Sequence, residues 1–151
     1  MISRLTLAVA AFALIATAKP NFQGDWKLNK DKSNFGEMPA PNSMSQKITH
    51  EDPKLKVASK SSMDMGDFEF EANYTTDGKE CVNTFMGNPV KSVLAWDGDM
   101  LKIDTKMSFN GNEMTMQDQW KITEDGKTFT IIRKFKSDMG EGEQKLVFDK
   151  Q

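Results

Sequence analysis

The stretch that decides the fold is MTMQDQWKITEDGKTFTIIRKF, residues 114–135. Apolar and polar side chains alternate on both sides of Asp125-Gly126, a dipeptide that suits a tight hairpin turn. With these two residues as the loop, the facing pairs are Ile122–Phe129, Trp120–Ile131, Asp118–Arg133 and Met116–Phe135. All of these side chains lie on one face, and a slip of one residue would turn the apolar set to water. The stretch therefore predicts an antiparallel hairpin of defined register.

The same alternation recurs along the chain and is interrupted by similar turn signals. These signals are Asp52-Pro53, Asp77-Gly78, Asp97-Gly98 and Asn110-Gly111. Strands joined by such turns are antiparallel neighbours. The same register argument places Leu101 opposite Trp120, Ile48 opposite Val57 and, around Asp77-Gly78, Tyr74 opposite Cys81. The predicted strands cover about residues 22–29, 43–51, 54–60, 67–76, 79–85, 89–96, 100–109, 112–123, 127–136 and 143–150.

A meander of about ten strands with one apolar face must cover that face, and the sequence predicts no helix to do so. Closing the sheet on itself hides the apolar face and removes the sheet edges. The predicted fold class is therefore all-β, an antiparallel up-and-down meander β-barrel. A two-sheet sandwich is the alternative, although it usually needs longer crossovers. The one long connection, residues 30–42, is predicted to be a lid over one mouth of the barrel.

Composition excludes several classes of protein. The chain of 151 residues has 20 Lys and Arg against 22 Asp and Glu, a balance that argues against a nucleic-acid partner. Its single Cys allows neither an internal disulfide nor a multi-cysteine zinc site. Apolar residues recur throughout, so the chain is expected to be ordered.

The N-terminus has the pattern of a secretory signal peptide. Arg4 supplies the positive charge, residues 5–15 form the apolar run, and Ala16-Thr17-Ala18 is a small-x-small cleavage site. We expect residues 1–18 to be removed and residues 19–151 to form a single exported barrel domain, periplasmic or secreted. An uncleaved membrane anchor is the alternative, but the run is shorter than the ~20 residues that span a bilayer.

The first predicted strand carries Gly24-x-Trp26, and the inward face of a late strand carries Arg133. A Gly-x-Trp on the first strand, a meander barrel and a late Arg resemble the calycin superfamily, which includes lipocalins and fatty-acid-binding proteins. The resemblance implies that Trp26 packs across the closed end against Arg133, and the simple signal peptide indicates a bacterial type. The chain departs from the family because it lacks the second lipocalin motif, the helix after the barrel and a helical pair in the first loop.

Asp118 and Arg133 are the sharpest candidates for a functional site. Both lie among apolar residues on the inward face, and a buried Arg needs a carboxylate partner. One interpretation is a structural ion pair with the guanidinium stacked on Trp26. The other is that Arg133 anchors the anionic head of an apolar ligand.

Methionine and aromatic side chains share the inward face with this pair. They are expected either to fill an ordinary core or to line a hydrophobic pocket. The residues predicted to bind a ligand are Arg133, Asp118, Trp120, Met107, Met114, Met116, Phe70 and Phe135, with Phe109 nearby.

Other residues give weaker signals. His50 is expected at the surface or in a turn, with haem ligation as a minor alternative, and Cys81 is expected to be a buried inert thiol opposite Tyr74. The pairs Met63-x-Met65 and Met114-x-Met116 suggest Cu(I) binding through thioethers, but the side chains on one face of any strand have this spacing. No metal or cofactor is predicted.

Two functions therefore compete. The first is an exported lipocalin-like protein that binds a small apolar or amphipathic molecule inside the barrel. The second is a protein-interaction module, such as a periplasmic or secreted hydrolase inhibitor with a filled barrel and an exposed apolar loop around residues 35–41. An enzyme is not expected, because no second inward carboxylate accompanies Asp118. Nucleic acid and stable membrane insertion after signal cleavage are also not expected, and the sequence leaves the oligomeric state open.

Overall fold

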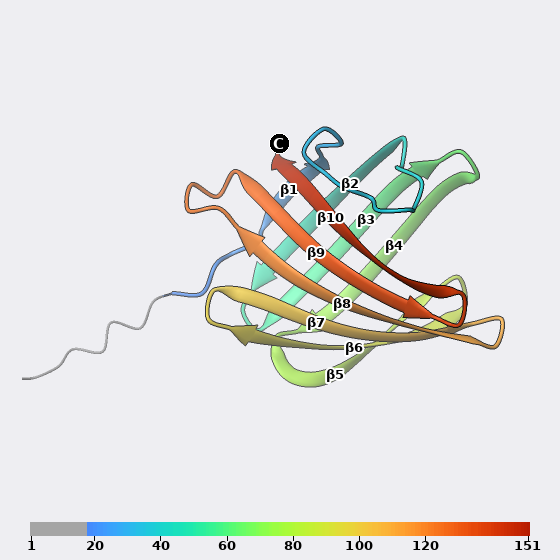
Figure 1. Ribbon diagram of the computed structural model, residues 1–151. Coiled ribbons are helices and arrows are strands. Elements are labelled where there is room, and N and C mark those ends of the chain that lie inside the picture. The colour runs from blue at the N-terminus through green and yellow to red at the C-terminus, as the bar shows by residue number, and fades with distance from the viewer. Residues whose placement is uncertain (1–17) are drawn as a thin grey trace, which may run out of the picture.

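The computed structural model describes residues 18–151, which form ten antiparallel strands (Figure 1). The predicted signal peptide lies outside this range except for Ala18. The strands are β1 Gly24–Leu28, β2 Ser43–Glu51, β3 Lys54–Met63, β4 Gly66–Thr75, β5 Asp77–Phe85, β6 Asn88–Asp97, β7 Met100–Phe109, β8 Asn112–Ile122, β9 Thr128–Ser137 and β10 Gly140–Lys150. β1 is shorter than predicted, while β3 and β10 are longer.

The strands form one sheet in the order β4-β3-β2-β1-β10-β9-β8-β7-β6-β5. β1 lies between β2 and β10, so the first and last strands are neighbours, as the blue and red ribbons of Figure 1 show. The sheet curls into a nearly closed barrel. This confirms the predicted all-β meander barrel and leaves no role for a two-sheet sandwich.

The predicted hairpin registers are confirmed on most of the wall. Asp118 pairs with Arg133 across β8 and β9. Leu101 pairs with Trp120 across β7 and β8, and Ile48 pairs with Val57 across β2 and β3. Asn110 and Gly111 adopt the positive φ angles of 50° and 80° that a two-residue hairpin loop requires.

The predicted ladder around Asp77-Gly78 is wrong, because β4 and β5 are the two ends of the sheet. A register shift between Asp77 and Glu80 makes the start of β5 follow β6 instead of turning back onto β4. Side chains bridge the gap. The Asn83 side chain accepts a hydrogen bond from the Asn73 amide at 2.8 Å and donates one to the Asn73 carbonyl at 3.1 Å.

The connection 30–42 forms part of the wall and does not line the interior cavity described below, which corrects the prediction of a lid. Asn34 pairs with Lys145 through two backbone hydrogen bonds of 2.7 Å, along the part of β10 that β1 leaves free. Gly36 approaches so closely that a Cβ atom there would lie 2.6 Å from the Glu143 carbonyl oxygen. The loop therefore continues the wall where β1 ends.

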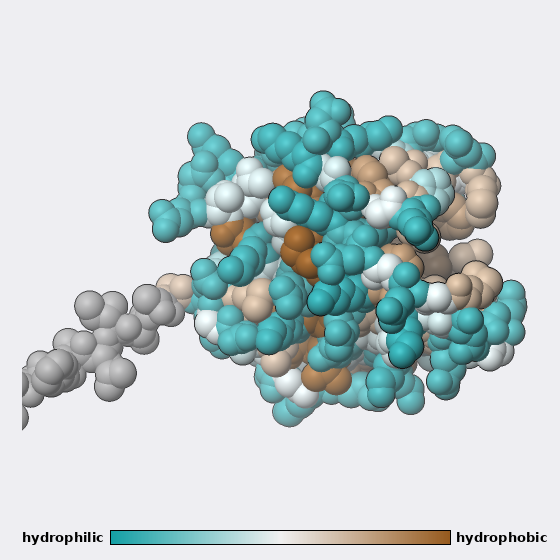
Figure 2. Space-filling model, in the orientation of Figure 1, coloured by the Kyte–Doolittle hydropathy of each residue, from teal (hydrophilic) through white to brown (hydrophobic). Residues whose placement is uncertain are grey.

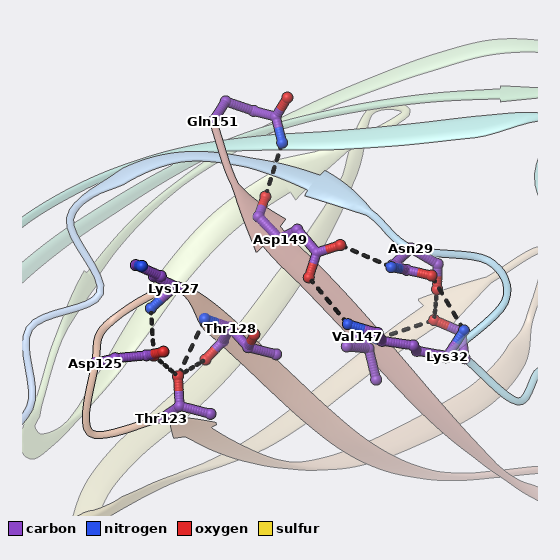
Figure 3. A network of polar contacts seen from close by, with 10 residues as sticks. Asn29, Lys32, Thr123, Asp125, Lys127, Thr128, Val147, Asp149 and Gln151 are labelled. Atoms are coloured by element: carbon purple, nitrogen blue, oxygen red, sulfur yellow. Dashed lines mark hydrogen bonds and ion pairs between the residues drawn. The ribbon is translucent and has the colours of Figure 1, made fainter.

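At one end of the barrel, polar contacts form two groups, one between β10 and the residues after β1, and one within the β8–β9 turn (Figure 3). The Asn29 side chain donates a 2.7 Å hydrogen bond to the Asp149 carboxylate. In the turn, the Thr123 hydroxyl donates to Asp125 at 2.6 Å. This end carries the start of β1 and the end of β10, and it is called the closed end below.

Candidate functional site

The barrel interior is filled at the closed end by an aromatic cluster. Phe129 lies at its centre, with ring centroids 4.9–5.5 Å from those of its neighbours. These neighbours are Phe22, Trp26, Trp120 and Phe148. All five aromatic side chains are buried, so this half of the interior is closed to water.

The other half is hollow. A cavity of about 380 Å³ opens at the end that carries the β3–β4, β5–β6, β7–β8 and β9–β10 turns. Its volume falls in the range of ~300–1,000 Å³ that is typical of small-molecule sites. Its wall is mostly apolar and comes from β2 to β10; members include Met44, Val57, Met63, Phe68, Phe70, Phe85, Val90, Ile103, Met107, Met116 and Leu146.

The Asp118–Arg133 pair lies on the cavity wall where the filled and hollow halves meet. Arg133 Nε and Nη2 donate to the two carboxylate oxygens at 2.8 and 2.7 Å. Trp120 Nε1 lies 3.4 Å from Asp118 Oδ2. Burial alone would lower the pKa of the Arg133 guanidinium, but the charge and hydrogen bonds of Asp118 more than offset this and raise it. The Arg133 guanidinium is therefore held in its charged form by a carboxylate in direct contact with it.

Tyr74 lies on the same cavity wall, and the charges of this pair affect the pKa of its hydroxyl. Burial raises the pKa of its hydroxyl to about 12, and the negative charge of Asp118 adds to the effect. The positive charge of Arg133 opposes the shift only in part. A negative charge is thus disfavoured at this point of the cavity.

The structure brings most of the predicted ligand-binding residues together. Arg133, Asp118, Trp120, Met107, Met116 and Phe70 all line the cavity. Met114 does not line it, and Phe135 lies over Gly142 beside a second, more polar hollow. Phe109 is 40% exposed at a turn. The cavity also uses side chains that the sequence did not single out, because their place depends on the volumes of distant residues.

The predicted contact between Trp26 and Arg133 is not formed. Arg133 is held by Asp118, and the cation above the Trp26 ring is Lys150 of β10, with Nζ 5.5 Å from the ring centroid. Gly24 allows this approach, since a Cβ atom there would lie 2.8 Å from Lys150 Cε. The cation that packs on the Trp of the first-strand motif therefore comes from the last strand, β10.

His50 is buried at the closed end, so the prediction of a surface residue is wrong. It is 2% exposed, and its Nδ1 accepts a 3.1 Å hydrogen bond from the Phe22 amide. Its other nitrogen lies 3.5 Å from Asp52, whose Oδ1 also accepts from Thr76 at 2.6 Å and Trp96 at 3.0 Å. The His50 ring therefore holds together side chains of the closed end and does not line the cavity.

The carboxylate of Asp52 gathers these contacts. Burial alone would raise the pKa of Asp52, but the hydrogen bonds from Thr76, Trp96 and His50 outweigh it and hold the pKa below its ordinary value of 3.8.

Cys81 is half-buried near the gap between β4 and β5, where its sulfur accepts a hydrogen bond from the Thr75 amide at 3.2 Å.

The open end has an apolar rim, which consists of the exposed large hydrophobic side chains on the connections at that end and at the end of β7. Its members are between 40% and 91% exposed: Met38, Met65, Met86, Phe109 and Met139. In residues 18–151, Val82 on β5 is the only other large hydrophobic side chain of comparable exposure. Figure 2 shows tan, hydrophobic residues around a hollow at the right-hand end. Met86 even adopts a φ of 48°, where turns favour Asn or Gly.

Residues 18–151 contain no cluster of three His, Cys, Asp or Glu side chains arranged to hold a metal ion. The same part of the chain also contains no helix of the length and hydropathy needed to cross a membrane.

The arrangement defines a class of fold, the calycin-like barrel of ten antiparallel strands, and this part of the predicted resemblance is confirmed. No protein-family model matches the chain, and no curated protein matches it significantly.

Similar solved structures come from several animals. Zebrafish ileal bile acid-binding protein, solved with cholic acid, matches with a TM-score of 0.60 at 14% identity, over 86% of this chain and 98% of that one. Secretory abundant heat soluble protein 4 from Ramazzottius varieornatus matches with a TM-score of 0.59 at 18% identity, over 89% and 97%. Human cRBP IV matches with a TM-score of 0.56 at 14% identity, over 87% and 99%. At these identities the likeness establishes the fold.

Proposed function

We propose that the protein is an exported binding protein that holds a small hydrophobic or amphipathic molecule in the hollow half of its barrel. The observation that carries this proposal is the apolar cavity of about 380 Å³ beside a filled aromatic half. A protein that needed the barrel only for stability would gain by filling this space, because each unfilled methyl-sized void costs ~1 kcal/mol.

The apolar rim supports the same proposal. Exposed methionines and Phe109 surround the mouth through which a ligand would enter. Flexible thioether side chains adapt to molecules of varied shape. The zebrafish bile acid-binding protein, which was solved as a complex with cholic acid, is consistent with a barrel of this kind holding an amphipathic molecule.

The alternative function, an interaction module with a filled barrel, requires an interior that is packed throughout. The cavity does not meet that requirement. The loop 35–41 also differs from that expectation, since Phe35 packs against the core and leaves Met38 as its exposed large hydrophobic side chain.

Export is part of the proposal and rests on Arg4, the apolar run at residues 5–15 and the Ala16-Thr17-Ala18 site. N-terminal sequencing of the protein recovered from its source should begin at Lys19. Retention of Met1 on the recovered protein would contradict export by cleavage.

Native mass spectrometry of the same material tests the binding function. We expect a population heavier than the polypeptide by the mass of one small molecule, which organic extraction removes. A polypeptide-only mass, together with no uptake of added apolar probes, would contradict the proposal.

A further inference from the structure

The cavity offers no free positive charge. Among the described residues of its wall, Arg133 is the one cation, and Asp118 occupies its Nε and Nη2 donors at 2.8 and 2.7 Å. The remaining charged residue of the wall, Glu69, is itself anionic and pairs with Lys60 at 3.0 Å near the surface. A carboxylate placed inside would meet one neutralised pair and one like charge.

Such a carboxylate would also lose its hydration without compensation. The cavity wall is mostly apolar, and burying an ionised group costs far more than burying a neutral one. The raised pKa of Tyr74 reports the same environment, because burial and the charge of Asp118 already oppose an anion there.

The cavity nevertheless has an unpartnered polar group on β2, a strand that does not carry the ion pair. Gln46 is 8% exposed and lines the cavity, and its Oε1 is the one buried side-chain N or O atom in residues 18–151 that lacks a hydrogen-bond partner. Ser59 lies directly across from it on β3, and Ser61 follows on the same face. A buried polar group without a partner costs about 1–3 kcal/mol, so a hydrogen bond to it contributes to ligand affinity.

The chemistry of an amide matches an uncharged partner. The terminal torsion of Gln is broad, so a rotation of the amide can turn Oε1, which only accepts hydrogen bonds, toward the cavity. A hydroxyl group can donate to this oxygen, whereas a carboxylate can only accept.

We infer that the cavity selects an uncharged amphipathic molecule, an apolar body that carries a hydroxyl group bound at Gln46, over the corresponding carboxylate. This inference rests on the proposed function, since it names the class of ligand for the same cavity. Asp118 is the selectivity-determining residue, because its charge cancels that of Arg133.

Displacement of the neutral fluorescent probe N-phenyl-1-naphthylamine tests the inference with two matched competitors, dodecan-1-ol and dodecanoate. Direct binding of the probe comes first and tests the proposed function alone. In wild type, we expect the alcohol to displace the probe at a concentration about tenfold lower than the carboxylate does.

Two variants separate the roles of the polar groups. Gln46→Leu should weaken competition by the alcohol about tenfold relative to wild type, because the hydrogen bond to the hydroxyl group is lost. Asp118→Asn should reverse the preference and make dodecanoate the better competitor, since Arg133 is then free to pair with it. Gln119→Leu, an outward-facing change on β8, is the control and should behave as wild type.

The outcomes are distinct. If the probe does not bind, the proposed function fails. If the probe binds but dodecanoate competes as well as the alcohol in wild type, the cavity is a binding site and the inference about ligand class is wrong. Circular dichroism confirms the folding of each variant, and Gln46→Leu decides the question if Asp118→Asn does not fold.

Discussion

Replacing Asp118 with Asn should destabilise the protein strongly, because it leaves Arg133 without its counter-charge. The carboxylate side chain is 9% exposed and that of Arg133 is 25% exposed, and two hydrogen bonds of 2.8 and 2.7 Å join them. Breaking a buried pair by removing one partner costs about 3–5 kcal/mol. We expect about 3 kcal/mol, the lower end, because Arg133 lies on a cavity that opens to solvent.

Urea unfolding followed by circular dichroism measures this cost, and a double-mutant cycle with Arg133→Met isolates the pair. The double variant should be more stable than the sum of the single costs predicts, with a coupling of about 2 kcal/mol. Asn keeps an oxygen that faces Trp120, so the change mainly removes charge. Glu71→Gln is the control: it disrupts the exposed Lys56–Glu71 pair of β3 and β4 and should cost less than about 1 kcal/mol. A coupling near zero, or an Asp118→Asn variant as stable as wild type, would refute the reasoning.

Tyr74 is the only tyrosine, so the rise in tyrosinate absorbance should have its midpoint near pH 12 in the folded protein and near pH 10 in urea. The free energy of unfolding should fall as pH rises between these two values, by about 1.4 kcal/mol per pH unit. Equal midpoints would contradict the burial of the Tyr74 hydroxyl. Asp52 has a pKa below 3.8 in the folded state, so its contribution to stability is present above pH 3.8 and is lost as pH falls through the folded pKa. The difference in unfolding free energy between wild type and Asp52→Asn should therefore shrink in acid. A constant difference from pH 6 to 2 would exclude this linkage. Gly36→Ala should cost about 2–3 kcal/mol in urea unfolding because its Cβ would meet the Glu143 carbonyl at 2.6 Å, whereas Gly87→Ala, which shares a positive φ but has open space, should cost about 1 kcal/mol; equal costs would show that the loop yields.

Most of the barrel wall could be predicted from the sequence because two-residue turns fix the register of the strands on either side. The facing of Asp118 and Arg133 follows from Asp125-Gly126 alone, and the structure confirms it. The same reasoning failed at Asp77-Gly78, where a register shift between β5 and β6 directs the start of β5 away from β4. The alternation of apolar and polar residues cannot reveal such a shift, since the strands on both sides of the turn keep the same pattern with or without it.

The features that the sequence did not predict depend on contacts between distant segments. His50 is buried because Phe22 and Trp96 stack on its ring, and neither contact leaves a periodic signal. Lys150 takes the position over Trp26 that the family resemblance implied for Arg133. Whether the inward face fills the barrel or lines a cavity depends on the summed volumes of side chains from nine strands.

The apolar rim had a detectable signal in the sequence. Met65, Met86 and Met139 each precede a glycine at a turn, whereas three of the four turns of the closed end carry Asp-Gly and the fourth carries Asp52-Pro53. A methionine in place of a normal turn former indicates selection for something other than the turn itself.

Binding of N-phenyl-1-naphthylamine to wild type and to a cavity-filled variant tests the central claim most directly. Met116→Trp places a large ring in the cavity, and Thr115→Trp places the same ring on the outer face of the same strand. We expect wild type and Thr115→Trp to bind one equivalent of the probe, and Met116→Trp to bind at least about tenfold more weakly, because the ring occupies the space of the ligand. Equal binding by both tryptophan variants, or no binding by wild type, would contradict a ligand site in the hollow half of the barrel.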